Sequence, residues 1–227
     1  MKLLALETSA KTASVAIWGE EGLLGLQIMN CGLTHSETLL PMAETLLRGC
    51  GLTVSALDLV AVSRGPGSFT GIRIGVATAK GLCWGANKPL CGVSTLAAMA
   101  WQGTAYEGKL LCCAMDARRN QVYNALFRVE DGVPKRISED RAIALNALLP
   151  ELTEAPVLLG DGAGLTAEAL TAEGIPYVLA PEPLRLQNGY GVALAALHTP
   201  QSEWGDTEPV YLRLSQAERE RLERMNK

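Results

Sequence analysis

A glycine-rich stretch at residues 63–85, SRGPGSFTGIRIGVATAKGLCWG, combines the residue types that commonly bind phosphate groups. Its glycines and hydroxyls follow an apolar strand pattern and precede a helical pattern, as in phosphate-binding loops. The P-loop pattern, GxxxxGK followed by Ser or Thr, nevertheless fails, because Gly71 is followed by Ile72 and Arg73. The glycine spacing also departs from GxGxxG. A helix N-terminus can hold an anion, so we expect at most weak anion binding by this loop alone.

Other groups that could do chemistry are few. A kinase needs carboxylates to hold magnesium-ATP, and only Glu7, Asp116 and Asp161 are candidates. A hydrolase needs a nucleophile with a base, but Ser68 has no assignable histidine, and the pair at residues 112–113 has no evident base. Two histidines and six cysteines form neither HxxxH nor CxxC. The residues therefore predict no catalytic group, no metal site and no cofactor of the chain's own.

The composition limits the class of protein. Hydrophobic residues make up 48% of the 227 residues and charged residues 19%, which is typical of a globular chain. A net charge of −4 argues against a protein that binds nucleic acid alone, although a local basic patch remains open. No apolar run reaches the roughly 20 residues of a membrane span, and no signal peptide is evident. We expect a cytoplasmic protein with reduced thiols and no membrane partner.

The elements of the first half follow a βββαβαβα order. Alternating and apolar runs predict strands, capping patterns at Thr34–Glu37 and at Ser94 predict helix starts, and Gly49–Gly51 predicts a helix end. The expected strands are 2–9, 12–18, 23–29, 56–63 and 88–93, and the expected helices are 35–48, 71–84 and 94–102.

The second half begins near Lys109 and is expected to form a smaller subdomain over 109–227, after an N-terminal subdomain over 1–108. The segment DARRN predicts a hairpin turn, and a capping pattern at Ser215–Glu218 predicts a terminal helix. Residues 130–136 are expected to be a loop. The expected strands are 109–115, 121–129, 155–160 and 175–179, the helices are 145–152, 165–174 and 189–198, and residues 209–214 are extended.

Two helices of the first half carry more apolar surface than a surface helix needs. The apolar residues of helix 35–48 cover an arc wider than the roughly 100° that faces a core. Helix 71–84 is apolar nearly all round, with Gly71 and Gly75 one turn apart, and glycine inside a helix costs roughly 1 kcal/mol against alanine. The glycines therefore indicate close backbone approach, either by this chain's own sheet or by a helix of another chain. We favour one interaction face formed by both helices.

Four segments make the sequence resemble the TsaB family, also called YeaZ, whose bacterial members are required for threonylcarbamoyladenosine (t6A) in tRNA. They are GPGSFTGIRIGVATAKGL, GVSTLAAMA, DARRNQVY and PVYLR, and they spread over nearly the whole chain. The resemblance implies an α/β fold of actin-like, ribonuclease-H type, with two subdomains that each hold a mixed sheet and helices. One departure is visible: the first strand often carries aspartate in this family and carries Glu7 here.

The resemblance also implies a role. The related TsaD binds metal through an HxxxH motif and transfers threonylcarbamoyl to adenosine 37 of tRNAs that read codons beginning with A. This chain lacks HxxxH and so is similar to the non-catalytic partner that binds and activates TsaD. TsaE joins that complex, TsaC supplies threonylcarbamoyl-adenylate, and the same face forms homodimers when TsaD is absent. We expect tRNA to be reached through the complex, and whether ATP or ADP binds at its interface stays open.

The expected interface with TsaD lies on the two N-terminal helices. Its residues are His35, Glu37, Leu39, Leu40, Ala43, Leu46, Leu47, Gly71, Arg73, Gly75, Thr78, Ala79, Lys80 and Leu82.

Three alternatives remain open. The first is that the chain is an enzyme, either an actin-fold small-molecule kinase or a glycoprotease-like hydrolase. DARRNQVY is either a turn locked by Asp116 with Arg118 or Arg119, or a basic contact for tRNA or a partner. LGDGAG at residues 159–164 is either a strand-to-helix turn or an adenosine-binding loop.

Overall fold

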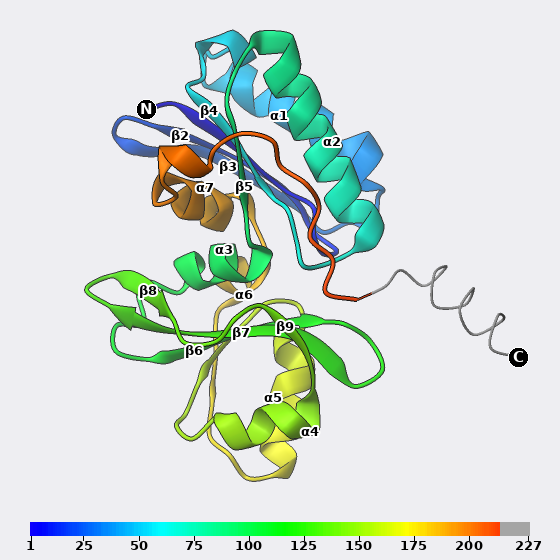
Figure 1. Cartoon of the computed structure of the whole chain (residues 1–227), viewed down its shortest axis with the longest axis vertical. Helices are drawn as coiled ribbons and strands as arrows, with labels where there is room; N and C mark the ends of the chain where they lie inside the picture. The colour runs from blue at the N-terminus through cyan, green and yellow to red at the C-terminus, as the bar shows by residue number, and fades with distance from the viewer. Residues whose placement is uncertain (214–227) are drawn as a thin grey trace, which may run out of the picture.

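Two mixed β-sheets, each covered by helices, build the molecule, and the computed structural model describes residues 1–213 (Figure 1). The first sheet has five strands in the order β3-β2-β1-β4-β5. The second has six strands, in the order β11-β10-β6-β7-β8 with β9 paired to β7. The expected α/β architecture with two mixed sheets is confirmed. The expected terminal helix from Ser215 lies outside the described residues.

The strands of the first sheet and their helices follow the predicted βββαβαβα order. β1 pairs antiparallel with β2 and parallel with β4, while β3 and β5 form the two edges. The apolar runs form strands because every side chain of β1 and β4 is buried between helices on both faces. The strands are β1 Leu3–Glu7, β2 Ala13–Gly19, β3 Gly22–Met29, β4 Leu59–Ser63 and β5 Leu90–Val93.

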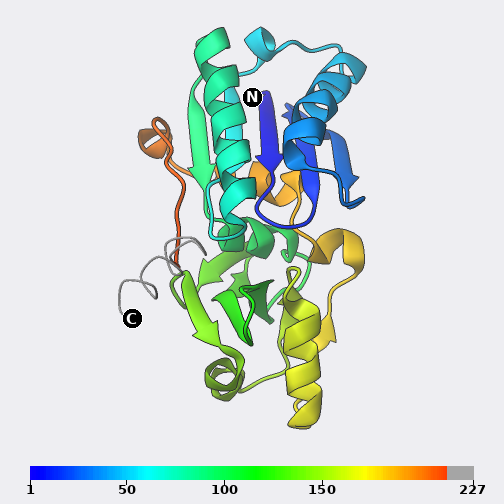
Figure 2. The same cartoon turned by 90° about the vertical axis from the view of Figure 1, so that its right-hand side faces the viewer.

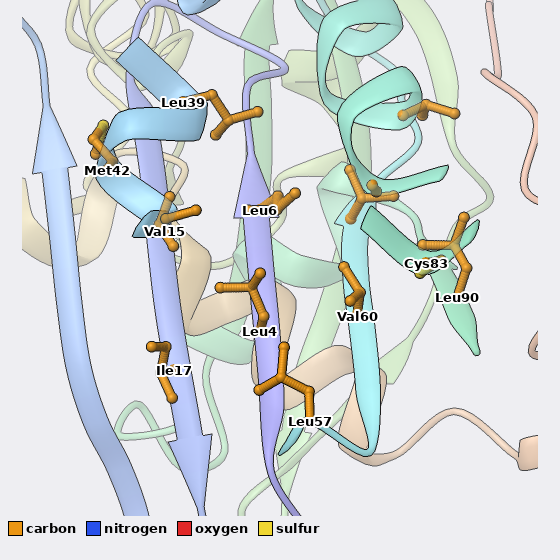
Figure 3. Close-up of a cluster of buried hydrophobic side chains, with 14 of the residues drawn as sticks. Leu4, Leu6, Val15, Ile17, Leu39, Met42, Leu57, Val60, Cys83 and Leu90 are labelled. Atoms are coloured by element: carbon orange, nitrogen blue, oxygen red, sulfur yellow. The ribbon is translucent and has the colours of Figure 1, made fainter. Parts of the chain in front are cut away.

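Two helices lie side by side on one face of this sheet (Figure 2). They are α1 His35–Gly49, which continues through Pro41, and α2 Phe69–Ala86. Figure 3 shows Leu39 and Met42 of α1 lying over the sheet residues Leu6 and Val15 in the shared core. Of the helices within residues 1–213, none combines the length and apolarity needed to span a bilayer.

The other face carries α3 Thr95–Gln102 and α7 Gly189–Leu197, which pack against each other. Residues of α3 contribute to the core of the first sheet and to that of the second sheet. α7 packs on β1, β2 and β4. It therefore belongs with the first sheet, although its sequence position had placed it in the subdomain expected over 109–227. Its small side chains allow this close approach: Gly189 lies against the backbone of Ala16.

The second sheet is built around a long hairpin. Its strands are β6 Leu110–Asp116, β7 Gln121–Glu130, β8 Val133–Arg136, β9 Arg141–Ala144, β10 Val157–Leu159 and β11 Val178–Leu179. Its helices are α4 Leu145–Leu148, α5 Ala163–Ala172 and α6 Glu182–Arg185. Short 3-10 turns cover Val54–Ala56, Leu149–Glu151 and Gln201–Glu203.

Two local expectations differ from the structure. Residues 133–136, expected in a loop, form β8, because Asp131 and Gly132 adopt positive φ and turn the chain back onto β7. The Thr34 side chain makes no capping hydrogen bond at the start of α1, so the expected capping box is absent. The Ser94 cap is confirmed, since its Oγ accepts from the amide of Ala97.

Residues 204–213 form a strap that runs alongside α2 (orange to red in Figure 1). The amide of Gly205 donates to the Leu90 carbonyl, and the amide of Val210 donates to the Arg64 carbonyl. Near its end, Tyr211 stacks on Phe69 of α2 and Arg213 donates to the Ala117 carbonyl after β6, so the strap ends between the two halves of the molecule.

Candidate functional site

The glycine-rich loop before α2 is closed by the chain's own backbone. Gly65, at φ 118°, leaves no room for a side chain because the carbonyl of Val210 lies against it. Gly67 faces the carbonyl of Ser9 in the same way, and the Ser68 amide donates to that carbonyl at 2.7 Å. The loop is thus filled by carbonyl oxygens, which would repel a phosphate, and its glycines serve packing.

The glycines inside α2 serve the same purpose. A Cβ on Gly71 would meet the carbonyl of Thr8, and one on Gly75 would meet the Thr8 hydroxyl. That hydroxyl donates to the Gly71 carbonyl at 2.8 Å. These glycines therefore approach the chain's own segment after β1. The interpretation that they approach a helix of another chain is corrected, because both glycines and Ala79 are buried here.

α1 uses most of its apolar arc for its own core. Leu39 is 1% exposed, Ala43 1% and Leu47 6%, while Leu40 is 51% exposed. The surplus apolar surface that the sequence indicated is therefore narrower than expected. It consists of Leu40 together with half-buried Leu46 and the rims of Ala43 and Leu47.

This remaining surface borders a groove of about 640 Å³ between α1, the segment after it and the C-terminal half of α2. Four of the predicted interface residues meet there: Leu40, Ala43, Leu47 and Leu82. The rest of the lining is Glu44, Arg48, Gly51, Leu52, Thr53 and Val54. We call this feature the α1–α2 groove.

Sequence reasoning missed two residues that line the groove and one exposed residue elsewhere on α2. Leu52 and Val54 enter only through the turn after α1, which no local pattern placed beside α2. Trp84 of α2 is 91% exposed, although its type predicts burial. The sequence did carry a sign of this exposure, because a helix that is apolar on all sides must expose some apolar residue unless it is fully enclosed.

The other predicted interface residues lie apart from the groove. His35 contacts the Ala10 carbonyl through Nε2 at 2.8 Å, and Glu37 is exposed on the first turn of α1. Thr78 is half-buried on α2. Arg73 and Lys80 are engaged by the strap: Arg73 Nε donates to the hydroxyl of Tyr211 at 2.9 Å, and Lys80 pairs with Asp206 and Glu208.

The carboxylates lie at the ends of strands that face the junction of the two halves. Glu7 is 1% exposed, its Oε1 accepts from the Ser9 amide, and burial raises the pKa of its carboxyl. Burial also raises the pKa of Asp161, whose Oδ1 accepts from Gln187 at 2.7 Å. Both shifts favour the neutral acid, which is a poor ligand for magnesium. Asp116 is exposed, and its Oδ1 accepts from the Arg118 amide.

A nucleotide, which an actin-like fold implies, is not matched by the glycines of residues 159–164. Gly160, at φ 99°, lies against the Ala114 carbonyl, and Gly162 lies against the backbone of Met115. Both glycines let the turn approach β6. The positive φ of Gly160 confirms the expected strand-to-helix turn. Packing on β6 thus accounts for both glycines, while Gly164 is exposed with open space beside it, and no chemical step is assigned through a nucleotide.

The candidate nucleophiles are poorly suited to hydrolysis. Burial raises the pKa of Cys112 to about 12 and that of Cys113 well above the ordinary value, which keeps both thiols protonated. Ser68 Oγ accepts from the Gly71 amide as the N-cap of α2. Within residues 1–213, no three His, Cys, Asp or Glu side chains gather closely enough to hold a metal ion.

Known proteins similar to this chain act in tRNA modification. Residues 30–182 match the sequence model of the family described as TsaD, tRNA N6-adenosine threonylcarbamoyltransferase. The tRNA threonylcarbamoyladenosine biosynthesis protein TsaB of Bacillus subtilis (strain 168) is 31% identical over 239 residues, which cover 98% of this chain and 99% of that protein.

Solved structures extend the likeness to the fold. YeaZ from Pseudomonas aeruginosa is 29% identical, with a TM-score of 0.74 over 93% of this chain and 99% of that one. The ethanolamine utilization protein EutJ from Carboxydothermus hydrogenoformans is 12% identical, with a TM-score of 0.51 over 86% of this chain and 90% of that one, which shows a shared fold alone. The expected α/β fold of actin-like type is confirmed.

Proposed function

The chain belongs to the TsaB family of tRNA threonylcarbamoyladenosine biosynthesis proteins, and we propose that it acts there as a non-catalytic partner that binds and activates TsaD. It acts in the t6A pathway, whose enzymes attach a threonylcarbamoyl group to adenosine 37 of tRNA. TsaE joins the complex, TsaC supplies the activated threonylcarbamoyl group, and a homodimer forms on the same face when TsaD is absent. ATP or ADP, if bound, lies at the interface of the complex and not within this chain.

The observation that carries this proposal is the α1–α2 groove. It is apolar along Leu40, Leu52, Val54 and Leu82, and Leu40 is half exposed at its rim. Glu44 and Arg48 border the same groove one helical turn apart, so an apolar centre has a charged rim, as in protein interfaces. A helix with an apolar stripe fits such a groove.

The similarity between this chain and the proposed partner also supports the groove as the binding site. The match to the TsaD family model includes all of α1 and α2. TsaD therefore offers helices of the same kind, and two related faces can pair in a pseudo-symmetric way. Of the predicted interface residues, Leu40 and Leu82 contact TsaD directly under this proposal, while the buried Ala43 and Leu47 shape the groove. Gly71 and Gly75 act indirectly, by seating α2 against the sheet.

The sharpest test replaces Leu40 with glutamate. Leu40 is 51% exposed, so the variant should fold normally, yet a carboxylate would be desolvated in the interface. We expect its affinity for TsaD, measured by isothermal titration calorimetry, to fall at least about tenfold. The matched control is Ile137→Glu, at an apolar residue that is 53% exposed beyond β8, and it should leave the affinity unchanged.

An omission assay tests activation. TsaC, TsaD, TsaE, threonine, bicarbonate, ATP and unmodified tRNA are combined with and without this chain, and t6A is counted. Product that depends on the chain and falls with Leu40→Glu supports the proposal. Equal product without the chain, or unchanged TsaD affinity of Leu40→Glu, contradicts it.

A further inference from the structure

The turn between β6 and β7 holds three successive residues in the left-handed region: Arg118 (φ 63°), Arg119 (φ 56°) and Asn120 (φ 56°). Such a conformation costs roughly 1–2 kcal/mol for each side-chain-bearing residue, least for asparagine. The surrounding contacts fix it, because Asp116 Oδ1 accepts the Arg118 amide at 2.7 Å and the Asn120 carbonyl accepts the Leu145 amide at 3.1 Å. Both arginine side chains are exposed. Glycine would satisfy this turn without strain, so arginine here serves something other than folding.

The strap brings one further cation to this turn. Arg213 Nη1 donates to the Ala117 carbonyl at 2.6 Å, so its guanidinium lies beside the turn. Two residues earlier, the ring of Tyr211 stacks on Phe69 with centroids 4.4 Å apart. The Arg73 guanidinium lies 3.9 Å from the Phe69 centroid. Continuous contacts thus join α2, the strap and the β6–β7 turn.

We name Arg73, Arg118, Arg119, Arg213 and Tyr211 the arginine arc. Guanidinium groups form two parallel hydrogen bonds to phosphate oxygens. Planar rings and guanidinium planes provide stacking surfaces for unpaired bases. The arc has four arginines against one neighbouring carboxylate, Asp116, whereas the whole chain carries a net charge of −4.

We propose that the arginine arc binds RNA directly, as a contact for the phosphate backbone and an unstacked base of the tRNA that the complex modifies. The identification of that RNA rests on the proposed function in the t6A pathway. The arc lies apart from the α1–α2 groove, because none of its residues lines the groove. The two proposals therefore assign TsaD and tRNA to different residues of the chain.

The test is a double variant, Arg118→Gly with Arg119→Gly. Glycine keeps the positive φ of the turn, so this variant should fold as the wild type does while losing both guanidinium groups. The measurement is fluorescence anisotropy of a labelled, unmodified tRNA transcript, titrated with the full chain alone and with the full chain bound to TsaD. We expect the Kd to rise about tenfold. The slope of log affinity against log salt should flatten by about 2.

A charge-matched control separates this site from general electrostatics. Lys109→Ser with Lys135→Ser also removes two exposed positive charges, from the start of β6 and from β8. This control should bind tRNA within about twofold of the wild type, because these charges do not contact the phosphates. A second variant, Tyr211→Leu, removes the exposed ring and should weaken tRNA binding with little change in the salt slope.

The outcomes are distinguishable from those for the groove. A tenfold loss of tRNA affinity with unchanged TsaD affinity supports the arginine arc. Unchanged tRNA affinity in the glycine variant, or an equal loss in the lysine control, overturns it. A loss of TsaD affinity in the glycine variant also overturns it, because the turn would then be a protein contact. Failure of wild-type TsaD binding rejects the proposed function, and the titration with the chain alone still tests RNA binding.

Discussion

Glu7 is a buried acid at the end of the central strand β1. Its side chain is 1% exposed and accepts the Ser9 amide, while burial raises the pKa of the carboxyl above its ordinary value of 4.5. A carboxyl with a raised pKa in the folded state binds its proton more tightly there than in the unfolded chain. Its contribution to stability is therefore present below the unfolded pKa and is lost as the pH rises through the folded pKa.

Glu7→Gln should reveal this dependence. Glutamine keeps the size of the side chain and an acceptor for the Ser9 amide, but it cannot ionise. We expect the thermal midpoint of the variant to exceed that of the wild type at pH 8, and the difference to shrink as the pH falls toward 4.5. Thermal unfolding followed by circular dichroism from pH 4.5 to 8 measures it. A difference that grows on acidification would show that Glu7 is stabilised as an anion.

At the scale of elements, α2 depends on two small residues to sit against the sheet. Gly71 and Gly75 let the helix approach Thr8, whose hydroxyl bonds to the Gly71 carbonyl. The same helix carries Gly81 on its outer side, where an added Cβ would meet nothing within 4 Å. Helix propensity is alike at Gly75 and Gly81, so the contacts of Gly75 with Thr8 and Val62 distinguish them.

Alanine at these two glycines should act in opposite directions. In Gly75→Ala the new methyl group would overlap the Thr8 hydroxyl, and we expect a loss of roughly 1–3 kcal/mol in the free energy of unfolding. Gly81→Ala should instead gain up to roughly 1 kcal/mol from helix propensity. Urea denaturation of the two variants beside the wild type measures both. Equal effects at the two positions would refute the close approach of α2 to Thr8.

At the scale of the whole molecule, α3 joins the two sheets. Ala98 packs in the core of the first sheet, while Leu96 and Met99 pack in that of the second. At its end, buried Gln102 donates through Nε2 to the carbonyls of Leu184 and Leu186, at 2.8 and 2.9 Å. These bonds hold the segment that leads from the second sheet back to α7.

Gln102→Leu should destabilise both halves together. It removes the donor of the Leu184 carbonyl, while the Leu186 carbonyl keeps Asn188 Nδ2 as a donor. We expect a loss of roughly 1–3 kcal/mol in the free energy of unfolding. Tryptophan fluorescence, which includes Trp18 and Trp101 beside the first sheet, and far-UV circular dichroism should report one coincident transition. Gln201→Leu, at an exposed position, is the control. Separate transitions by the two probes would mean that α3 does not couple the halves.

Features that depend on neighbours along the chain could be predicted without the structure. Apolar runs predicted the strands of the first sheet, Ser94 predicted the start of α3, and the motifs of residues 65–82 indicated the family. Each of these patterns is contained in a short stretch of sequence. How distant segments meet became known from the fold. Ser9 and Val210 close the glycine loop, and Thr8 occupies the space beside Gly75. α7 returns to the first sheet, and Leu52 and Val54 complete the groove. The strap carries Arg213 to the β6–β7 turn. These contacts join residues far apart in sequence, so no local pattern could specify which apolar or glycine surface would be covered and by what.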